Sequence, residues 1–259
     1  MKKASILHAD ETGTKVNGKN YWIHSCSNEK YSVLTSHPIR GKKVIEEAGI
    51  LPKFNGILSH DCWYAYDCYP QIVHSLCWAH FLRELQSIEE NTNLEFPAKI
   101  REFILKLKEK VEKKEEFSSE EEINIWLKYM ALIEDGKQEE RPYYQTDVLE
   151  PKKRKSKAFN LLKRLSRYED VLRFFIERKI SLFTNNAAER EVRNIKVKSK
   201  IQGTFRSELR SQIYCRIRGY ISTMKKNEKN QCPVLKSIFD LYEIMFPRAK
   251  QQGSLQQKC

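Results

Sequence analysis

Three acidic residues far apart in the chain have the chemistry of a shared metal site. Asp10 and Asp61 each stand at the polar end of a short apolar segment, and Glu189 begins an amphipathic segment near the other end of the chain. Three carboxylates at one place repel one another and raise each other's pKa values unless cations neutralise them. Mg²⁺ and Mn²⁺ prefer oxygen ligands, and two such ions about 3.5–4 Å apart can assist an in-line phosphoryl transfer. We therefore predict a site for Mg²⁺ or Mn²⁺ at Asp10, Asp61 and Glu189.

Each acid also has an ordinary structural interpretation. Asp61 could cap the helical turn that follows it, and Asp10 could be a turn residue at the end of a strand. Glu189 could belong to a surface helix with common Glu–Arg pairs. The metal hypothesis depends on the combination of two strand acids and one helix acid with the basic charge described below.

The N-terminal part of the sequence predicts a five-stranded mixed sheet. Segments 5–12, 21–26 and 31–35 read as consecutive antiparallel strands, and Asn17-Gly18 is a strong hairpin signal between the first two. A short helix over 40–48 ends at Gly49, and segments 55–61 and 72–76 are two further strands. If the first and fourth strands are neighbours, Asp10 and Asp61 lie together at one edge of the sheet.

The middle of the chain has helical periodicity. Apolar residues recur at helical spacing over 78–88, 100–111, 123–133 and 159–175, while 109–122 and 141–156 read as a charged bend and a polar loop. No strand pattern interrupts this block, so we predict an all-helical insertion before the helix of Glu189. The expected divisions are 1–90 and 181–225 for the catalytic core, 91–180 for the insertion, and 226–259 for a last helix, over 235–246, with a disordered tail.

The segment around Glu189 reads as the start of a helix. Asn185 or Asn186 is a suitable N-cap, and Ala188, Val192 and Ile195 form one buried stripe. Glu189 lies beside that stripe, with cations one turn away. This places a carboxylate where it can reach a metal ion while phosphates approach from outside.

Net charge indicates a polyanionic partner. The chain of 259 residues has a formal charge of +13, and segment 150–230 holds 23 Lys and Arg against 8 acids, so that the remainder is close to neutral. We expect phosphate contacts with double-stranded DNA through six cations near Glu189. A solvated basic face is the alternative. The six residues are Arg190, Arg193, Lys196, Lys198, Lys200 and Arg206.

The apolar runs and the cysteines indicate in which cellular compartment the protein works. No apolar run is long enough to cross a bilayer, and the N-terminus lacks the apolar core of a signal peptide. Seven scattered cysteines do not form a disulfide framework, so we expect reduced thiols. We predict a soluble, cytoplasmic protein that contacts no membrane.

Several motifs in order resemble the catalytic region of insertion sequence 66 family transposases over almost the whole chain, about 6–246. They read HADET at 8–12, HD at 60–61, CWAHFLREL at 77–85, NNAAER at 185–190, KSKIQGTFRS at 198–207 and YIST at 220–223. The resemblance implies a ribonuclease-H-like α/β fold with an Asp-Asp-Glu triad at Asp10, Asp61 and Glu189. It also implies Mg²⁺-dependent strand cleavage and transfer at transposon ends, on the nucleoid and by a homo-oligomer on DNA.

The sequence departs from this family at its N-terminus. Such transposases carry a helical segment, a cysteine-containing zinc motif and a DNA-binding module ahead of the catalytic region, whereas here the first strand begins close to Met1. Either the chain is a truncated or split gene product, or a separate end-binding or accessory protein supplies end recognition. A catalytically silent DNA-binding remnant and a structure-selective nuclease of the same fold are the alternative functions.

Histidines and a cysteine flank the predicted centre. His74, Cys77 and His80 have a spacing that could bind a metal, but three ligands are one short of a structural zinc site. We favour Cys77 and His80 as supports for the sheet beside the centre, as the resemblance implies. His8 and His60 either tune the neighbouring acids and contact phosphate or pack as strand histidines, and Asn186 is a further supporting residue of this region.

Overall fold

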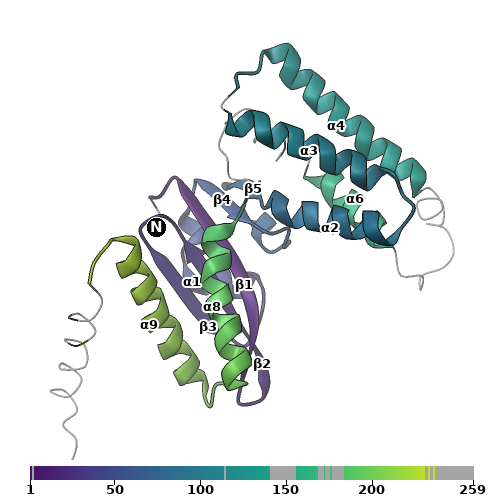
Figure 1. Cartoon of the computed structure of the whole chain (residues 1–259). Coiled ribbons are helices and arrows are strands. Elements are labelled where there is room, and N and C mark those ends of the chain that lie inside the picture. Colours follow the sequence, from purple (N-terminus) through teal and green to yellow (C-terminus); the bar gives the residue numbers. More distant parts are fainter. Residues whose placement is uncertain are drawn as a thin grey trace, which may run out of the picture.

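The computed structural model describes residues 1, 3–113, 115–140, 156–168, 172, 176, 184–230, 233 and 236. They form an α/β fold in which a sheet is followed by helices (Figure 1). The strands are β1 (Ile6–Val16), β2 (Lys19–Ser27), β3 (Ser32–His37), β4 (Ile57–His60) and β5 (Val73–Leu76). The helices are α1 (Lys42–Ala48), α2 (Trp78–Asn91), α3 (Phe96–Glu112), α4 (Ser119–Glu139), α6 (Lys157–Arg167), α8 (Asn186–Gln202) and α9 (Glu208–Lys226), with short 3₁₀ turns η1 (Leu51–Lys53) and η2 (Tyr66–Cys68).

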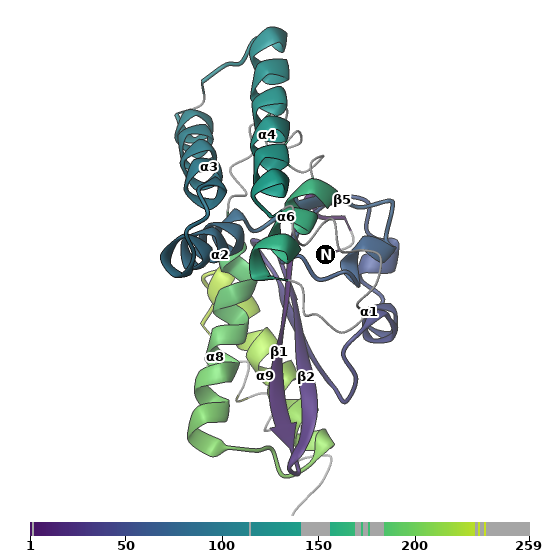
Figure 2. The same ribbon diagram turned by 90° about the vertical axis from the view of Figure 1, so that its right-hand side faces the viewer.

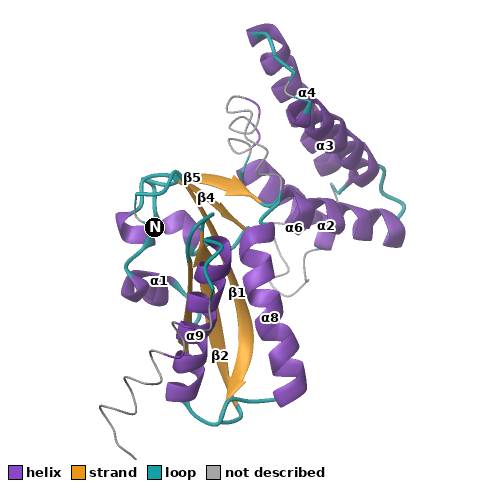
Figure 3. Ribbon diagram, turned by 60° about the vertical axis from the view of Figure 1, so that its left-hand side comes forward, coloured by secondary structure: helices purple, strands orange, loops and turns teal. Residues whose placement is uncertain are grey.

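The five strands form one mixed sheet in the order β3-β2-β1-β4-β5 (Figure 3). The first three strands are antiparallel, and β4 and β5 run parallel to β1 and to each other. Asn17 and Gly18 both have positive φ, which closes the hairpin in the way this dipeptide predicts. The predicted meander and the predicted contact between the first and fourth strands are confirmed. The hairpin is longer than expected, because β1 continues to Val16.

The two faces of the sheet carry different chemistry because side chains alternate along each strand. On one face α8 lies along β1, where Thr14 Oγ1 is 3.0 Å from Ser199 Oγ. On the other face Leu7 and Ala9 join an apolar cluster with residues of α1, η1 and η2. Asp10 is an even-numbered residue of β1, like Thr14, and therefore belongs to the face that α8 covers.

Helix α9 lies close to β3 through small side chains. Ser211 Oγ and Ser36 Oγ are 2.8 Å apart, and a Cβ added to Gly219 would come within 2.9 Å of the Ser32 carbonyl oxygen. Since the approach of helix to strand leaves no room for a side chain there, glycine at position 219 is a packing requirement.

Helices α2, α3, α4 and α6 share one apolar core and stand at the β5 end of the sheet (Figure 2). Buried side chains include Phe81 and Leu85 of α2, Ile104 of α3 and Tyr129 of α4, whose hydroxyl donates to the Leu165 carbonyl over 3.0 Å. The helices predicted over 78–88, 100–111 and 123–133 are confirmed. The predicted bend begins later than expected, because α3 continues to Glu112.

The helix predicted over 159–175 is confirmed as α6 as far as Arg167. Leu172 is also helical and buried, whereas Phe175 lies outside the described residues. Of the loop predicted over 141–156, residues 141–155 lie outside the described residues, as does the tail. Of the helix predicted over 235–246, only residue 236 is described, and it is helical. In the described part of the chain, no helix has both the length and the apolar character that a membrane span needs.

Candidate active site

Strand pairing places Asp10 beside Asp61. The parallel register of β1 and β4 pairs Ile6 with Ile57 and His8 with Ser59, and the same offset extended past the last pair sets Asp10 level with Asp61, which directly follows β4. The negative charge of Asp61 acts on Asp10, which agrees with this placement. Asp10 Oδ1 accepts a hydrogen bond from the backbone N–H of Glu11 over 2.8 Å, and Asp61 Oδ1 accepts from the N–H of Trp63 over 3.1 Å. The two predicted sheet acids therefore lie at the same edge.

Asp10 carries negative charge in unfavourable surroundings. Burial, followed by the negative charges of Glu11 and Asp61, raises its pKa from an ordinary value of 3.8 to about 7. Lys196 of α8 acts in the opposite direction but does not cancel the effect. A carboxylate in this position is stabilised by a bound cation, which is what a ligand for a divalent metal ion requires.

Glu11, the next residue of β1, is an acid whose negative charge is balanced by a neighbouring cation. It projects to the other face, where Arg40 donates to Oε1 and the Tyr66 hydroxyl donates to Oε2 over 2.9 Å. The guanidinium of Arg40 lies between the rings of Trp22 and Trp63, 4.6 and 4.4 Å from their centroids. Sequence reasoning did not find this cluster, because its members come from five separate elements or loops.

Glu189 lies in the first turn of α8 and faces the start of α2. Its Oε1 is 3.6 Å from Cys77 Sγ, 3.7 Å from His80 Nδ1 and 3.9 Å from a terminal guanidinium nitrogen of Arg83. Among the described residues, the one trio whose ligand atoms all lie within 4.8 Å of one another is Cys77, His80 and Glu189. The structure thus holds the Glu189 carboxylate beside Cys77 and His80. The predicted trio of Asp10, Asp61 and Glu189, all of them described residues, does not bring three ligand atoms within 4.8 Å of one another.

Asn185 connects the start of α8 to the sheet. Its side chain is buried and donates to the Ala9 carbonyl over 2.7 Å, and its Oδ1 lies 3.1 Å from His8 Nδ1. Its backbone N–H donates to Cys77 Sγ over 3.3 Å. Asn185 occupies the N-cap position, but its side chain makes no capping bond because it is used by β1.

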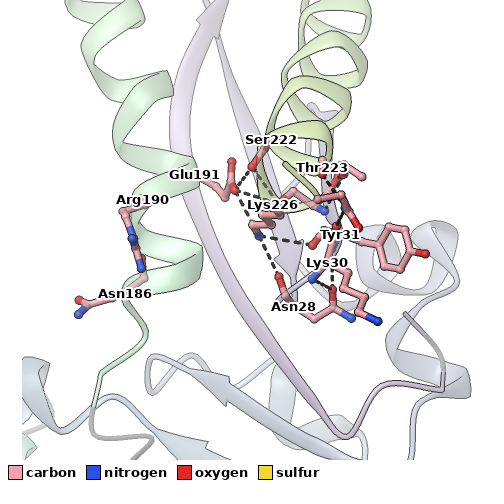
Figure 4. A network of polar contacts seen from close by, with 11 residues as sticks. Asn28, Lys30, Tyr31, Asn186, Arg190, Glu191, Ser222, Thr223 and Lys226 are labelled. Atoms are coloured by element: carbon pink, nitrogen blue, oxygen red, sulfur yellow. Dashed lines mark hydrogen bonds and ion pairs between the residues drawn. The ribbon is translucent and has the colours of Figure 1, made fainter. Parts of the chain in front are cut away.

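Asn186, the predicted supporting residue, is exposed, and its backbone carbonyl accepts from Arg190 Nε over 3.2 Å. Both residues lie on the side of α8 away from α9 (Figure 4). The supporting role in the structure therefore belongs to Asn185, the residue before it. Two adjacent asparagines in the sequence gave no signal as to which amide faces the sheet.

The histidines of β1, β4 and β5, which are His8, His60 and His74, pack against neighbouring residues. His60 is completely buried, its Nε2 is 3.0 Å from His74 Nδ1, and burial together with His74 lowers its pKa to about 3. His60 is therefore neutral and cannot touch a phosphate from solvent. Burial also lowers the pKa of His8. His74 is bonded to His60 and is not part of the trio formed by Cys77, His80 and Glu189.

Glu191 anchors α8 on its opposite side (Figure 4). Its buried Oε1 accepts from Ser32 Oγ over 2.8 Å and from Ser222 Oγ, and lies 3.5 Å from Lys226 Nζ. Lys226 also donates to the Asn28 carbonyl over 3.0 Å. Because neighbouring helical residues are rotated by about 100°, fixing Glu191 also fixes the direction in which Glu189 projects. This network also joins α8, α9 and β3, and the sequence gave no indication of it.

Cations border a groove between α8 and the β1–β2 hairpin. The groove has a volume of about 530 Å³, and its lining includes Lys15, Lys196, Lys200 and Trp22. Lys198 differs from the other five predicted phosphate contacts, because it is half-buried and its Nζ is 3.4 Å from the centroid of the Tyr214 ring. The five exposed residues are Arg190, Arg193, Lys196, Lys200 and Arg206.

Comparison with known proteins places this arrangement in a family. The family described as "Transposase IS66 family" matches residues 1–212, which is most of the chain. No curated protein matches the chain.

Replacing Asn185 by alanine should destabilise the protein, whereas the same change at Asn186 should not. Asn185→Ala removes the amide that satisfies the buried Ala9 carbonyl, which costs about 1–3 kcal/mol. Asn186→Ala changes an exposed side chain and should stay within about 0.5 kcal/mol of wild type. Urea unfolding of both variants measures the difference, and equal stabilities would contradict the role assigned to Asn185.

The free energy of unfolding of the metal-free protein should depend on pH because the pKa of Asp10 is raised in the folded state. A folded-state pKa of about 7 means that the folded protein binds this proton more tightly than the unfolded chain does. The carboxylate therefore lowers the free energy of unfolding progressively from about pH 4 to about pH 7, and fully above that. Asp10→Asn should be more stable than wild type at pH 8 by on the order of 1–3 kcal/mol, and the gain should vanish near pH 4.

Denaturant unfolding of wild type and Asp10→Asn at a series of pH values, with chelator present, measures this difference. The comparison of two proteins removes the contributions of His24 and His60, whose pKa values burial lowers in both. A difference that does not depend on pH would show that Asp10 is not an uncompensated acid.

Proposed function

The chain belongs to the IS66 family of transposases, and on this premise we propose that it cuts DNA strands and transfers them at a centre formed by Asp10, Asp61 and Glu189. The observation that supports the proposal is the parallel pairing of β1 with β4, whose register, extended past its last pair, sets Asp10 level with Asp61. The raised pKa of Asp10 supports it, because this carboxylate lacks the cation partner that Glu11 has.

We infer a ribonuclease-H-like fold for the catalytic part. The central strand β1 carries the first acid, its antiparallel neighbour β2 leads to β3, and its parallel neighbour β4 leads to the second acid. Helix α8 crosses this sheet at β1 and brings the third acid from more than a hundred residues away. We further propose that α3, α4 and α6 belong to the predicted insertion 91–180, which lies between the second and third acids in the sequence and packs on α2.

The acids fit a hard divalent cation. Carboxylate oxygens are the ligands that Mg²⁺ and Mn²⁺ prefer, and Asp10 and Asp61 offer them side by side. When bound, such ions activate the attacking hydroxyl and stabilise the leaving oxygen of an in-line transfer. In this proposal Asp10 and Asp61 would hold ligand oxygens, and Glu189, whose carboxylate lies 3.6 Å from Cys77 Sγ, would supply the third carboxylate.

The groove beside α8 fits a DNA backbone. Lys196 belongs to this groove and also acts electrostatically on Asp10, so phosphates that follow the groove arrive at the acidic centre. Lys15 and Lys200 continue the positive charge along the hairpin. Such contacts hold a duplex in register without reading its sequence. Helix α8 therefore supplies both the third acid and the cations that position the substrate.

Removing any one of the three acids should abolish cleavage and leave DNA binding in place. Asp10→Asn, Asp61→Asn and Glu189→Gln should each lower the rate of Mg²⁺-dependent cleavage by about a hundredfold or more, because a lost metal ligand removes several kcal/mol of transition-state stabilisation. The substrate is a duplex carrying the terminal sequences of the element that encodes the protein.

Glu120→Gln is the matched control, because Glu120 is an exposed acid on α4 in the helical group. Wild-type cleavage by any of the three site variants would refute the centre. Joined product in the wild-type reaction identifies a transposase, and cut product without joining identifies a nuclease.

The groove lysines should set the salt dependence of DNA binding. Lys196→Ala and Lys200→Ala should each weaken duplex binding and reduce the slope of log K against log salt by about 0.9, the contribution of one phosphate contact. Lys53→Ala is the control, because Lys53 is an exposed lysine of η1 on the other face of the sheet. Fluorescence anisotropy between about 50 and 300 mM salt measures the slope, and unchanged slopes would place the DNA elsewhere.

A further inference from the structure

We propose that Cys77, His80 and Glu189 form a binding site for a transition-metal ion of the zinc class, and that the bound ion holds Glu189 away from Asp10 and Asp61. The site itself follows from the geometry of these three side chains. Its consequence for catalysis rests on the proposed function, in which Glu189 completes the set of acids.

The spacing of the three ligand atoms fits a tetrahedral ion. Zinc bonds of about 2.3 Å to sulfur and about 2.0 Å to nitrogen and oxygen, at tetrahedral angles, place ligand atoms about 3.3–3.5 Å apart. Glu189 Oε1 is 3.6 Å from Cys77 Sγ and 3.7 Å from His80 Nδ1. The ligand atoms of Cys77 and His80 lie within 4.8 Å of each other, so an ion can be accommodated with side-chain shifts of about an ångström or less.

The backbone already holds two of the ligands in position. Cys77 is the N-cap of α2 and His80 lies one turn later, where its N–H donates to the Cys77 carbonyl over 3.0 Å. The N–H of Cys77 donates to the His60 carbonyl over 3.0 Å, and its Sγ accepts from the N–H of Asn185. The ligands thus stand on the starts of two helices that are both tied to the sheet, which is the rigid placement a metal site needs.

His80 has an unused ring nitrogen at this point. Its Nδ1 is shielded from solvent and has no hydrogen-bond partner, although the Glu189 carboxylate lies 3.7 Å away. That distance is too long for a hydrogen bond but suits two ligands of one ion. A buried polar atom without a partner usually has a ligand, an ion or a water in the functional state.

Ligand chemistry separates this site from the aspartate pair. Thiolate and imidazole select zinc-like ions, whereas Asp10 and Asp61 offer the oxygen ligands that Mg²⁺ prefers. Glu189 can serve either set, because carboxylates bind both kinds of ion. Three protein ligands also leave one position open to water or to a phosphate oxygen. The exposed side chain of Arg83 lies nearby, with a guanidinium nitrogen 3.9 Å from Glu189 Oε1.

Cobalt(II) provides a direct optical test of the site. Titration of the full-length, chelator-treated protein with Co²⁺ should give a thiolate-to-cobalt absorption band in the near ultraviolet with one equivalent bound, and Zn²⁺ should displace it. Cys77→Ser should remove the band, and its hydroxyl can still accept from the Asn185 N–H. His80→Gln, which changes a partly exposed side chain, should weaken Co²⁺ binding about tenfold or more.

Cys68→Ser is the matched control, because Cys68 is an exposed thiol outside the site. Its band should equal that of wild type. No band in the wild type, a band that survives Cys77→Ser, or a band lost in Cys68→Ser would each overturn the site.

Manganese binding tests the coupling to the acids. Bound Mn²⁺ is measured by electron paramagnetic resonance, and one equivalent of Zn²⁺ should weaken its binding at least about tenfold in the wild type but not in Cys77→Ser. Equal Mn²⁺ affinity with and without Zn²⁺ would overturn the coupling. Absence of Mn²⁺ binding in zinc-free protein would contradict the proposed catalytic centre, whereas the cobalt band decides about the Cys77 site independently.

Discussion

The pairing of β1 with β4 is the constraint on which the rest of the structure depends. Parallel strands in register bring their carboxyl ends to one edge, so two acids that are fifty residues apart become neighbours. Burial, followed by the negative charges of Glu11 and Asp61, makes the carboxylate of Asp10 hard to ionise without a cation. The fold therefore keeps Asp10 where its negative charge is unfavourable, and a divalent ion bound there would neutralise that charge. Groups with strongly shifted pKa values are common in active sites.

Helix α8 is held in a fixed rotation over this edge from both sides. On one side the buried amide of Asn185 bonds to β1, and on the other the carboxylate of Glu191 bonds to β3 and α9. Between these two anchors Glu189 projects towards the start of α2, and the cations of α8 remain on the solvent side. The same helix can thus offer an acid to the sheet edge and positive charge to a polyanion. Acidic and basic residues of α8 recur at helical spacing, so they project from different sides of the helix.

The strands, the helices and the neighbouring strands could be predicted from the sequence better than the side-chain contacts between distant segments. Apolar alternation, the Asn17-Gly18 turn and the glycine after α1 were enough to predict the meander, and the acids at strand ends were enough to suggest that the first and fourth strands are neighbours. Local patterns could not show that Glu189 faces Cys77, or that Asn185 and not Asn186 bonds to the sheet. Those facts depend on how side chains from segments about a hundred residues apart pack together, and periodicity within one segment contains no information about its partner.

The central claim is that Asp10 is an uncompensated acid that a divalent cation neutralises. The direct measurement is a titration of its carboxyl carbon by ¹³C NMR, first without metal and then with Mg²⁺, using Asp10→Asn to assign the signal. We predict a pKa of about 7 without metal and a pKa lowered by at least about one unit when Mg²⁺ is present. A carboxyl group that titrates near its ordinary value, or one whose titration Mg²⁺ does not change, would contradict the account.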